Sequence, residues 1–170
     1  MTTEARGDGE GQPSKMVKFS LLTAFVAALP SIFASPVPLE KRLEGEGIHL
    51  FNCYPISGGT ITWISVVGYC ANDPDCSNPQ HVLSGDNVCI MKHSAGWDDF
   101  HIWEGGVQSC RFPNGVVFSW DITSTAQSQQ DYTYVGWGDN GHRQFAGFKD
   151  NKRQGATFDY HRCEKIYYFI

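Results

Sequence analysis

The stretch VVFSWDIT, residues 116–123, alternates large apolar side chains with mostly polar ones. Successive side chains of an extended strand point to opposite faces, so every second residue shares a face. The positions that share the apolar face are Val116, Phe118, Trp120 and Ile122. This period of two predicts a strand with one face buried, and we expect Trp120 to lie in the core.

An Asn-Gly pair directly before this strand predicts a hairpin that turns back onto VQSCRF, residues 107–112. Other segments rich in β-branched and aromatic residues are bounded by turn residues. They cover residues 59–69, 87–93, 99–105, 131–138, 143–149 and 156–170. Since no window of twelve residues shows a helical apolar stripe, the sequence predicts one all-β domain of about eight antiparallel strands. Its architecture would be a β-sandwich or a small barrel.

Six cysteines follow residue 50, and their even number predicts three disulfides in an exported protein. A metal site is not expected, because the chain has no Cys-x-x-Cys motif and no close pair of histidines; no cofactor is expected either. Spacing alone does not choose among the possible pairings. We expect the bridges Cys53–Cys163, Cys70–Cys76 and Cys89–Cys110, of which the first would join the first strand to the last.

Residues 16–34 have the layout of a secretory signal peptide. Lys18 supplies a positive charge, an apolar run follows, and Ala34 is a small residue at a plausible cleavage point. The alternative is a membrane anchor, but the run is well short of the roughly 20 residues that span a bilayer. A signal peptide normally begins at the initiator, which favours Met16 over Met1 and makes residues 1–15 an over-extended N-terminus.

Residues 35–42 form a Pro-rich segment that ends in the dibasic pair Lys41-Arg42. This segment resembles the Leu-Glu-Lys-Arg processing sites of fungal secretory precursors, which kexin-type proteases cleave. Cleavage there would release a mature β-rich domain, residues 43–170; the alternative is a plain solvated charge pair. A second dibasic pair, Lys152-Arg153, lies between two expected strands, and we expect a tight turn to protect it. A two-chain product is the alternative.

The chain is acidic, with 13 Lys and Arg against 18 Asp and Glu and a net charge of −5. Five of the basic and four of the acidic residues precede residue 43, so the expected mature domain has a net charge of −6. Stable nucleic-acid binding through phosphate neutralisation is therefore not expected. No second long apolar run follows the leader, so we expect a mature form outside the membrane, and a monomer.

Histidines beside acidic and basic residues are the candidate catalytic groups. His101 precedes Glu104 by three positions, whereas His142 and His161 each precede an arginine, in the first case Arg143. Small secreted ribonucleases combine His, Glu and Arg to move a proton and to hold phosphoryl charge. The alternative is that these are surface histidines without a catalytic role, since on a strand His101 and Glu104 would face opposite sides.

The chain is rich in aromatic residues, with 5 Trp, 7 Tyr and 11 Phe, and several tryptophans stand beside polar turn residues. A sugar ring has an apolar C–H face and a rim of hydroxyls, so its site needs an aromatic side chain with polar groups beside it. The candidate binding residues are Trp97, Asp98, Trp137, Asp139, Asn140, His142 and Arg143. The alternative is that the tryptophans fill the core.

The leader in residues 16–42 and the six cysteines together resemble those of small secreted, cysteine-rich fungal proteins of the effector or toxin-like sort. The resemblance implies action outside the cell and names no catalytic residue. The first hypothesis is a non-enzymatic effector that binds a host or competitor protein through its surface loops. The alternatives are a carbohydrate-binding module for a cell-wall glycan, and a small secreted acid-base hydrolase such as a ribonuclease.

Overall fold

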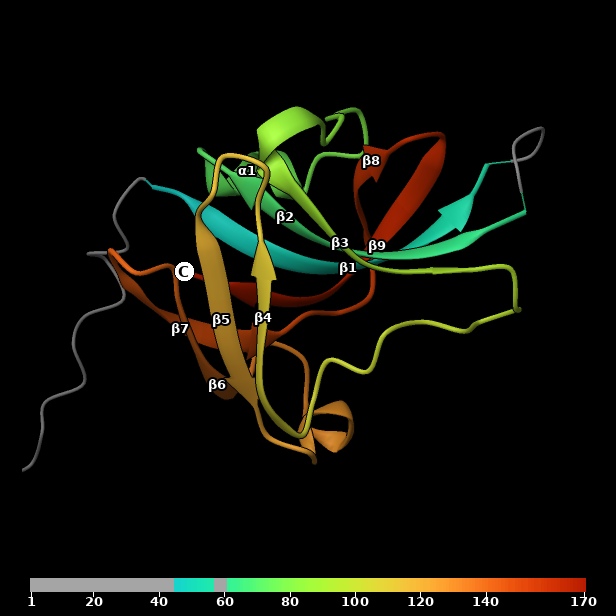
Figure 1. The fold of residues 1–170 in the computed structure, drawn as a ribbon. Coiled ribbons are helices and arrows are strands. Elements are labelled where there is room, and N and C mark those ends of the chain that lie inside the picture. Colours follow the sequence, from blue (N-terminus) through green and yellow to red (C-terminus); the bar gives the residue numbers. More distant parts are fainter. Residues whose placement is uncertain (1–44, 57–60) are drawn as a thin grey trace, which may run out of the picture. The chain divides into compact units, whose positions relative to one another are not determined.

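The computed structural model describes residues 45–56 and 61–170, which form an all-β fold (Figure 1). Its strands are β1 (Gly47–Pro55), β2 (Trp63–Cys70), β3 (Val88–Ser94), β4 (Gly106–Arg111), β5 (Val117–Ile122), β6 (Tyr134–Asp139), β7 (Gln144–Lys149), β8 (Gln154–Phe158) and β9 (His161–Phe169). The helical elements are α1 (Asp73–Cys76) and two 3₁₀ turns, η2 (Gly85–Asn87) and η3 (Ala126–Ser128). The expected signal peptide, pro-segment and cleavage points lie outside the described residues.

Eight of the strands form an antiparallel sheet in the order β3-β2-β1-β9-β7-β6-β5-β4, and β8 pairs separately with β9. The sheet curls until its end strands, β3 and β4, lie close to each other, which makes a nearly closed barrel. Of the two architectures that the sequence predicts, the barrel is the one that forms. Within the described residues, no ladder of backbone hydrogen bonds joins β3 to β4, so the barrel is closed by proximity and not by strand pairing.

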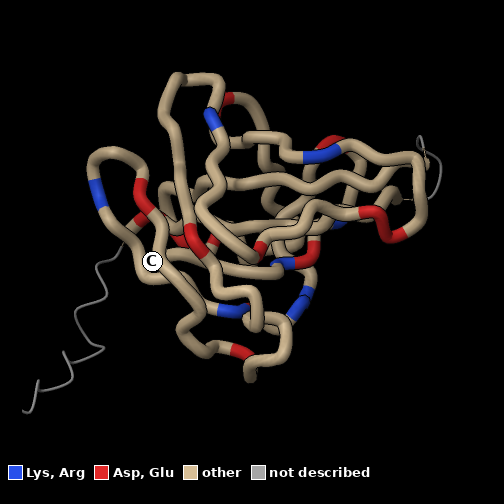
Figure 2. The backbone as a smooth tube through the Cα atoms, turned by 60° about the horizontal axis from the view of Figure 1, so that its bottom comes forward, with Lys and Arg blue, Asp and Glu red and all other residues tan. Residues whose placement is uncertain are grey.

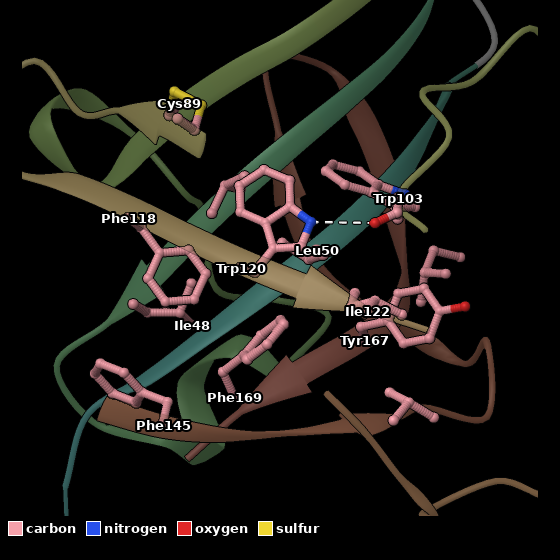
Figure 3. Packing of buried hydrophobic residues seen from close by; sticks show 14 of the residues in the cluster. Ile48, Leu50, Cys89, Trp103, Phe118, Trp120, Ile122, Phe145, Tyr167 and Phe169 are labelled. Atoms are coloured by element: carbon pink, nitrogen blue, oxygen red, sulfur yellow. Dashed lines mark hydrogen bonds between the residues drawn. A yellow bond between two sulfur atoms is a disulfide. The ribbon is translucent and has the colours of Figure 1, made fainter. Parts of the chain in front are cut away.

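Large apolar side chains fill the barrel interior (Figure 3). The predicted alternation in β5 is confirmed, because Phe118, Trp120 and Ile122 are fully buried. The indole N–H of Trp120 donates a hydrogen bond to the carbonyl oxygen of Trp103 at 3.1 Å. The ring of Phe118 lies 5.9 Å from that of Trp120 and 5.2 Å from that of Phe169. The interior is thus a packed core rather than an open lumen.

A second apolar cluster lies on the outer face of β1, β2 and β9, beneath α1 and β8. A β-bulge in β9 lets this strand contribute side chains to both clusters. Leu50 pairs with Tyr167 and Phe51 pairs with Lys165, which leaves Ile166 as the extra residue. A bulge shifts the alternation of side chains by one residue. The first half of β9 therefore faces the outer cluster, whereas its second half faces the barrel interior.

Three disulfides tie the sheet together, and they have the pairing expected from the sequence. Cys53–Cys163 joins the neighbouring strands β1 and β9, Cys70–Cys76 joins the end of β2 to α1, and Cys89–Cys110 joins β3 to β4. Three such bridges indicate an oxidising environment. Within residues 45–56 and 61–170, no helix has the length and apolar character needed to cross a bilayer.

The strand predicted at residues 99–105 is wrong, because this segment has an irregular backbone. Some of its backbone groups form hydrogen bonds with side chains and not with a neighbouring strand. The amide of His101 donates to Ser65 Oγ at 2.9 Å, and Gln108 Nε2 donates to the carbonyl of Ile102 at 3.0 Å. The segment carries the chain from β3 to β4 across the barrel end.

The single strand predicted at residues 156–170 is also wrong, because a turn divides it into β8 and β9. Asp159 and Tyr160 form this turn with φ values of 42° and 61°, which lie outside the strand region. The dibasic pair lies in the β7–β8 connection, where Lys152 has a φ of 58° and Arg153 accepts a backbone hydrogen bond from Lys165. Its protection from proteolysis stays a prediction.

Candidate functional site

A pocket with a volume of about 300 Å³ opens at one end of the barrel. Its apolar lining comes from Ile48, Phe112 and Val116. Its polar lining consists of Glu46, Tyr69, Asp86, Asn114, Asn140 and His142. These residues lie where β1, β3, β5 and β7 begin and where β2, β4 and β6 end. The mouths of β-barrels are a common location of small-molecule sites, and this volume is at the lower end of the usual range.

Two Asn-Gly turns form part of the pocket wall. In the β4–β5 turn, Asn114 Oδ1 accepts a hydrogen bond from the amide of Val116 at 2.9 Å. In the β6–β7 turn, Asn140 Oδ1 accepts from the amides of His142 and Arg143 at 3.0 and 2.8 Å. Because a backbone amide only donates, each asparagine uses its oxygen in the turn. Neither Nδ2 group has a hydrogen-bond partner among the described residues, so each can act as a donor to a ligand.

Glu46 is held at the rim by two neighbours. Its Oε2 accepts a hydrogen bond from the hydroxyl of Tyr69 at 3.0 Å, and its Oε1 lies 3.5 Å from Nη1 of Arg143. Burial, and then the hydrogen bond to Glu46, raise the pKa of Tyr69 above its ordinary value. The hydroxyl of Tyr69 thus donates to Glu46, whose two carboxylate oxygens can each accept more than one hydrogen bond.

Asp86 and His142 complete the polar rim. Asp86 belongs to η2, directly before β3, and His142 follows the φ-positive Gly141 in the β6–β7 turn. Both residues are exposed. Within the part of the chain that the structure describes, neither side chain has a hydrogen-bond or ion-pair partner. These two groups can therefore be altered without breaking an internal contact.

The structure does not place the two candidate tryptophans on one face. Trp97 is 83% exposed in the β3–β4 connection, beside Asp98, and its ring lies 5.2 Å from that of Trp63. This connection extends to the right in Figure 1, away from β6. Trp137 is 42% exposed on β6, where it pairs with Asp121 and Ala146 of the flanking strands. Neither tryptophan lines the pocket, and neither does Asp139.

The candidate catalytic residues lie at opposite ends of the barrel. His142 and Arg143 are in the β6–β7 turn at the pocket end, whereas Glu104 and His101 precede β4 and His161 begins β9 at the other end. His101 Nε2 lies 2.6 Å from Gln108 Oε1. His161 is buried, with its ring nitrogens 2.6 and 2.9 Å from two backbone carbonyl oxygens. The structure therefore does not join these five residues in one cleft.

Glu104 has a structural contact instead, because it accepts a hydrogen bond from the hydroxyl of Tyr167 in the barrel wall. Gln127 Nε2 also donates to the Glu104 carboxylate, at 2.7 Å. Burial, and then the hydrogen bond to Glu104, raise the pKa of Tyr167. Burial, and then the charge of Glu164, raise the pKa of Tyr54 from 10.0 to about 12.

The raised pKa values of Tyr54 and Tyr167 predict that the protein loses stability at alkaline pH. The folded protein holds their protons more strongly than the unfolded chain, so their contribution to stability is complete below pH 10 and falls as the pH rises towards 12 and beyond. A pH titration that follows circular dichroism and tyrosinate absorbance together should show late ionisation coupled to unfolding. Tyr54→Phe keeps the ring and should reduce the loss. Ionisation of all tyrosines near pH 10 in a still-folded protein would contradict this prediction.

Basic and acidic residues are scattered along the described chain rather than gathered into one basic stripe (Figure 2). Within residues 45–56 and 61–170, no three His, Cys, Asp or Glu side chains come together as metal ligands. The polar groups that line the pocket are carboxylates, amides, a phenol and an imidazole.

Two of the binding residues predicted from the sequence, Asn140 and His142, line the pocket. The sequence analysis did not predict the other polar lining residues, which are Glu46, Tyr69, Asp86 and Asn114. One signal in the sequence could have pointed to Asn114. Alternate hairpins of an up-and-down barrel turn at the same end, so the two Asn-Gly pairs mark a common end. The chain matches no protein-family model, no curated protein and no solved structure.

Proposed function

We propose that this protein is a secreted, non-catalytic binding protein of the effector-like sort, which acts through the loops at the pocket end of its barrel. The ligand is a short saccharide of a cell-wall glycan. One observation carries the proposal: the pocket combines an apolar floor with a rim that offers both hydrogen-bond donors and acceptors.

A saccharide needs this combination because each of its hydroxyls can donate and accept. The Nδ2 groups of Asn114 and Asn140 are donors, since their oxygens are used in the turns. The carboxylates of Glu46 and Asp86 are acceptors. Phe112 and Ile48 supply an apolar surface for the C–H face of a sugar ring.

The packed barrel interior supports a small ligand held at the mouth. Trp120 and Phe118 fill the space below the pocket end, so a ligand reaches the loops and not the centre of the barrel. A chain of sugars would enter with one end and leave the remainder in solvent. This geometry suits the terminal units of a glycan better than the middle of a polymer.

Secretion belongs to the same proposal. Three disulfides agree with an oxidising compartment. The sequence pattern of residues 16–42 supports export and kexin-type processing. Intact-mass measurement of the protein recovered from culture medium tests this part, because a mature chain should begin at Leu43. A product that retains residues 1–34 would contradict it.

Saccharide titration tests the pocket. Oligosaccharides of chitin, β-glucan and mannan are added to the protein, and binding is followed by calorimetry and amide chemical shifts. We expect one of them to bind, and we expect His142→Ala and Asp86→Asn each to weaken binding by about tenfold, or ~1.4 kcal/mol. His93→Ala is the matched control, because His93 is exposed on β3 and does not line the pocket.

Trp137→Ala separates the pocket from the outer surface of β6. Trp137 does not line the pocket, so its removal should leave the affinity unchanged. If Trp137→Ala abolished binding while His142→Ala had no effect, the saccharide would bind to the outer face of the barrel and the pocket proposal would be wrong. The absence of binding to all three glycan classes would also overturn it.

A further inference from the structure

The barrel has a seam between β3 and β4. Every other neighbouring pair in the barrel order is joined by a ladder of backbone hydrogen bonds. No such ladder joins β3 to β4 in residues 45–56 and 61–170, although the two strands lie close together. What links them is the disulfide Cys89–Cys110.

This seam runs into the wall of the pocket. Asp86 lies three residues before Cys89, and Phe112 lies two residues after Cys110. Asp86 and Phe112 both line the pocket, and they reach it from the two sides of the seam. The bridge therefore sets the spacing between two parts of the pocket wall.

The seam bridge is also the most accessible of the three. Cys89 is 8% exposed and Cys110 is 5% exposed, whereas the other four cysteines are exposed by 2% or less. The Cys53–Cys163 bridge lies at 0% exposure beneath α1 and β8. Thiol–disulfide exchange needs direct access to a sulfur. Both cysteines of the seam bridge belong to the core cluster, but their slightly greater exposure favours attack at this bridge over the other two.

We propose that Cys89–Cys110 is a redox latch that controls the pocket, and that low-molecular-weight thiols open it. The thiolate of one thiol attacks Sγ of Cys89 or Cys110, the S–S bond breaks, and a mixed disulfide forms. A second thiol then displaces the protein sulfur. Two electrons pass from the two thiols to the bridge, which yields two cysteine thiols and one molecule of oxidised disulfide.

Opening the latch frees both end strands. After reduction, the backbone ladders that remain on the end strands, within the described residues, are those of β3 with β2 and of β4 with β5. Asp86 then moves with β3, and the turn that carries Phe112 moves with β4. A ligand that contacts both sides loses affinity because the two sides no longer keep a common geometry. The pocket part of this inference rests on the proposed function, whereas the opening of the seam does not.

Graded reduction tests the latch in the wild-type protein. The protein is exposed to increasing concentrations of glutathione or dithiothreitol, free thiols are trapped with iodoacetamide, and labelled peptides are identified by mass spectrometry. We expect Cys89 and Cys110 to be labelled at the lowest concentrations while the other two bridges stay intact. Earlier labelling of Cys70 and Cys76, or labelling of all six cysteines together, would overturn the proposal.

Amide hydrogen exchange on the same samples tests the opening without any ligand. Exchange in residues 88–94 and 106–111 should become at least tenfold faster in the selectively reduced protein. The same result is expected for Cys89→Ser/Cys110→Ser. The control, Cys70→Ala/Cys76→Ala, leaves the seam bridge in place, so exchange in these two strands should change no more than exchange in the rest of the sheet. Unchanged exchange after selective reduction would show that the seam stays closed.

A binding measurement tests the effect of the latch on the pocket, with the oligosaccharide that binds to the oxidised protein in the saccharide titration. Selective reduction should weaken its binding by at least tenfold, and reoxidation should restore it. If the oxidised protein binds no oligosaccharide, the proposed function fails, and the labelling and exchange results still decide the latch. If binding is equally strong in both states, the latch proposal fails and the proposed function stands.

Discussion

Replacement of Trp120 by alanine is expected to lower the free energy of unfolding by about 3–5 kcal/mol. Trp120 is fully buried and packs against Phe118 and Trp103, with ring centroids 5.9 Å away in both cases. Its indole N–H also donates to the carbonyl of Trp103 (Figure 3). Alanine would leave a cavity at the centre of the barrel and an unpaired buried carbonyl, so both losses add.

Trp97→Ala is the matched control because it deletes the same atoms from an 83% exposed position. It should change the free energy of unfolding by about 0.5 kcal/mol or less. Urea unfolding, followed by far-UV circular dichroism and fluorescence, measures both variants against the wild type. Equal effects of the two substitutions would show that Trp120 does not have the central packing role described above.

Removal of the Cys53–Cys163 bridge should have an effect of similar size. The bridge connects residues that are 110 positions apart, and the chain-entropy model assigns such a long loop about 5 kcal/mol of stabilisation. Because both sulfurs are also fully buried in the outer cluster, Cys53→Ala/Cys163→Ala loses packing as well. We expect this variant to be largely unfolded at 37 °C.

Cys70→Ala/Cys76→Ala provides the comparison, since its bridge spans only 6 positions. The same model predicts about 2 kcal/mol for this short loop. Guanidinium unfolding of both variants, and of the fully reduced wild type, measures the difference. If the short-loop variant lost as much stability as the long-loop variant, or if full reduction left the melting temperature unchanged, restriction of the unfolded chain would not explain the stability of this domain.

Local patterns explain how much of the fold follows from the sequence. The alternation around Trp120 and the Asn-Gly turn at Asn114 act over two to four residues, so they predict β5 and its hairpin directly. The same reasoning fails at residues 99–105. The sequence of this segment has a strand-like pattern, but the segment pairs with no neighbouring strand. It also fails at Asp159 and Tyr160, where left-handed backbone conformations interrupt an apolar run.

The candidate site was predicted less well because its residues come from distant parts of the chain. Asn140 and His142 were identified through their turn, which is a local feature. Glu46, Asp86 and Tyr69 have no such pattern around them, and they become neighbours of His142 only where β1, β2 and η2 meet the β6–β7 turn.

The sequence by itself determined an all-β domain with paired cysteines, because side-chain period, turn residues and cysteine count depend on neighbouring positions or composition alone. Only the tertiary structure decided that the sheet closes into a barrel rather than packing as two layers. The bulge at Ile166 lets β9 serve both apolar clusters, and the bridge Cys89–Cys110 joins the two end strands. Closure brings Asp86 and Phe112 to one pocket, because the end strands β3 and β4 become adjacent only when the sheet curls.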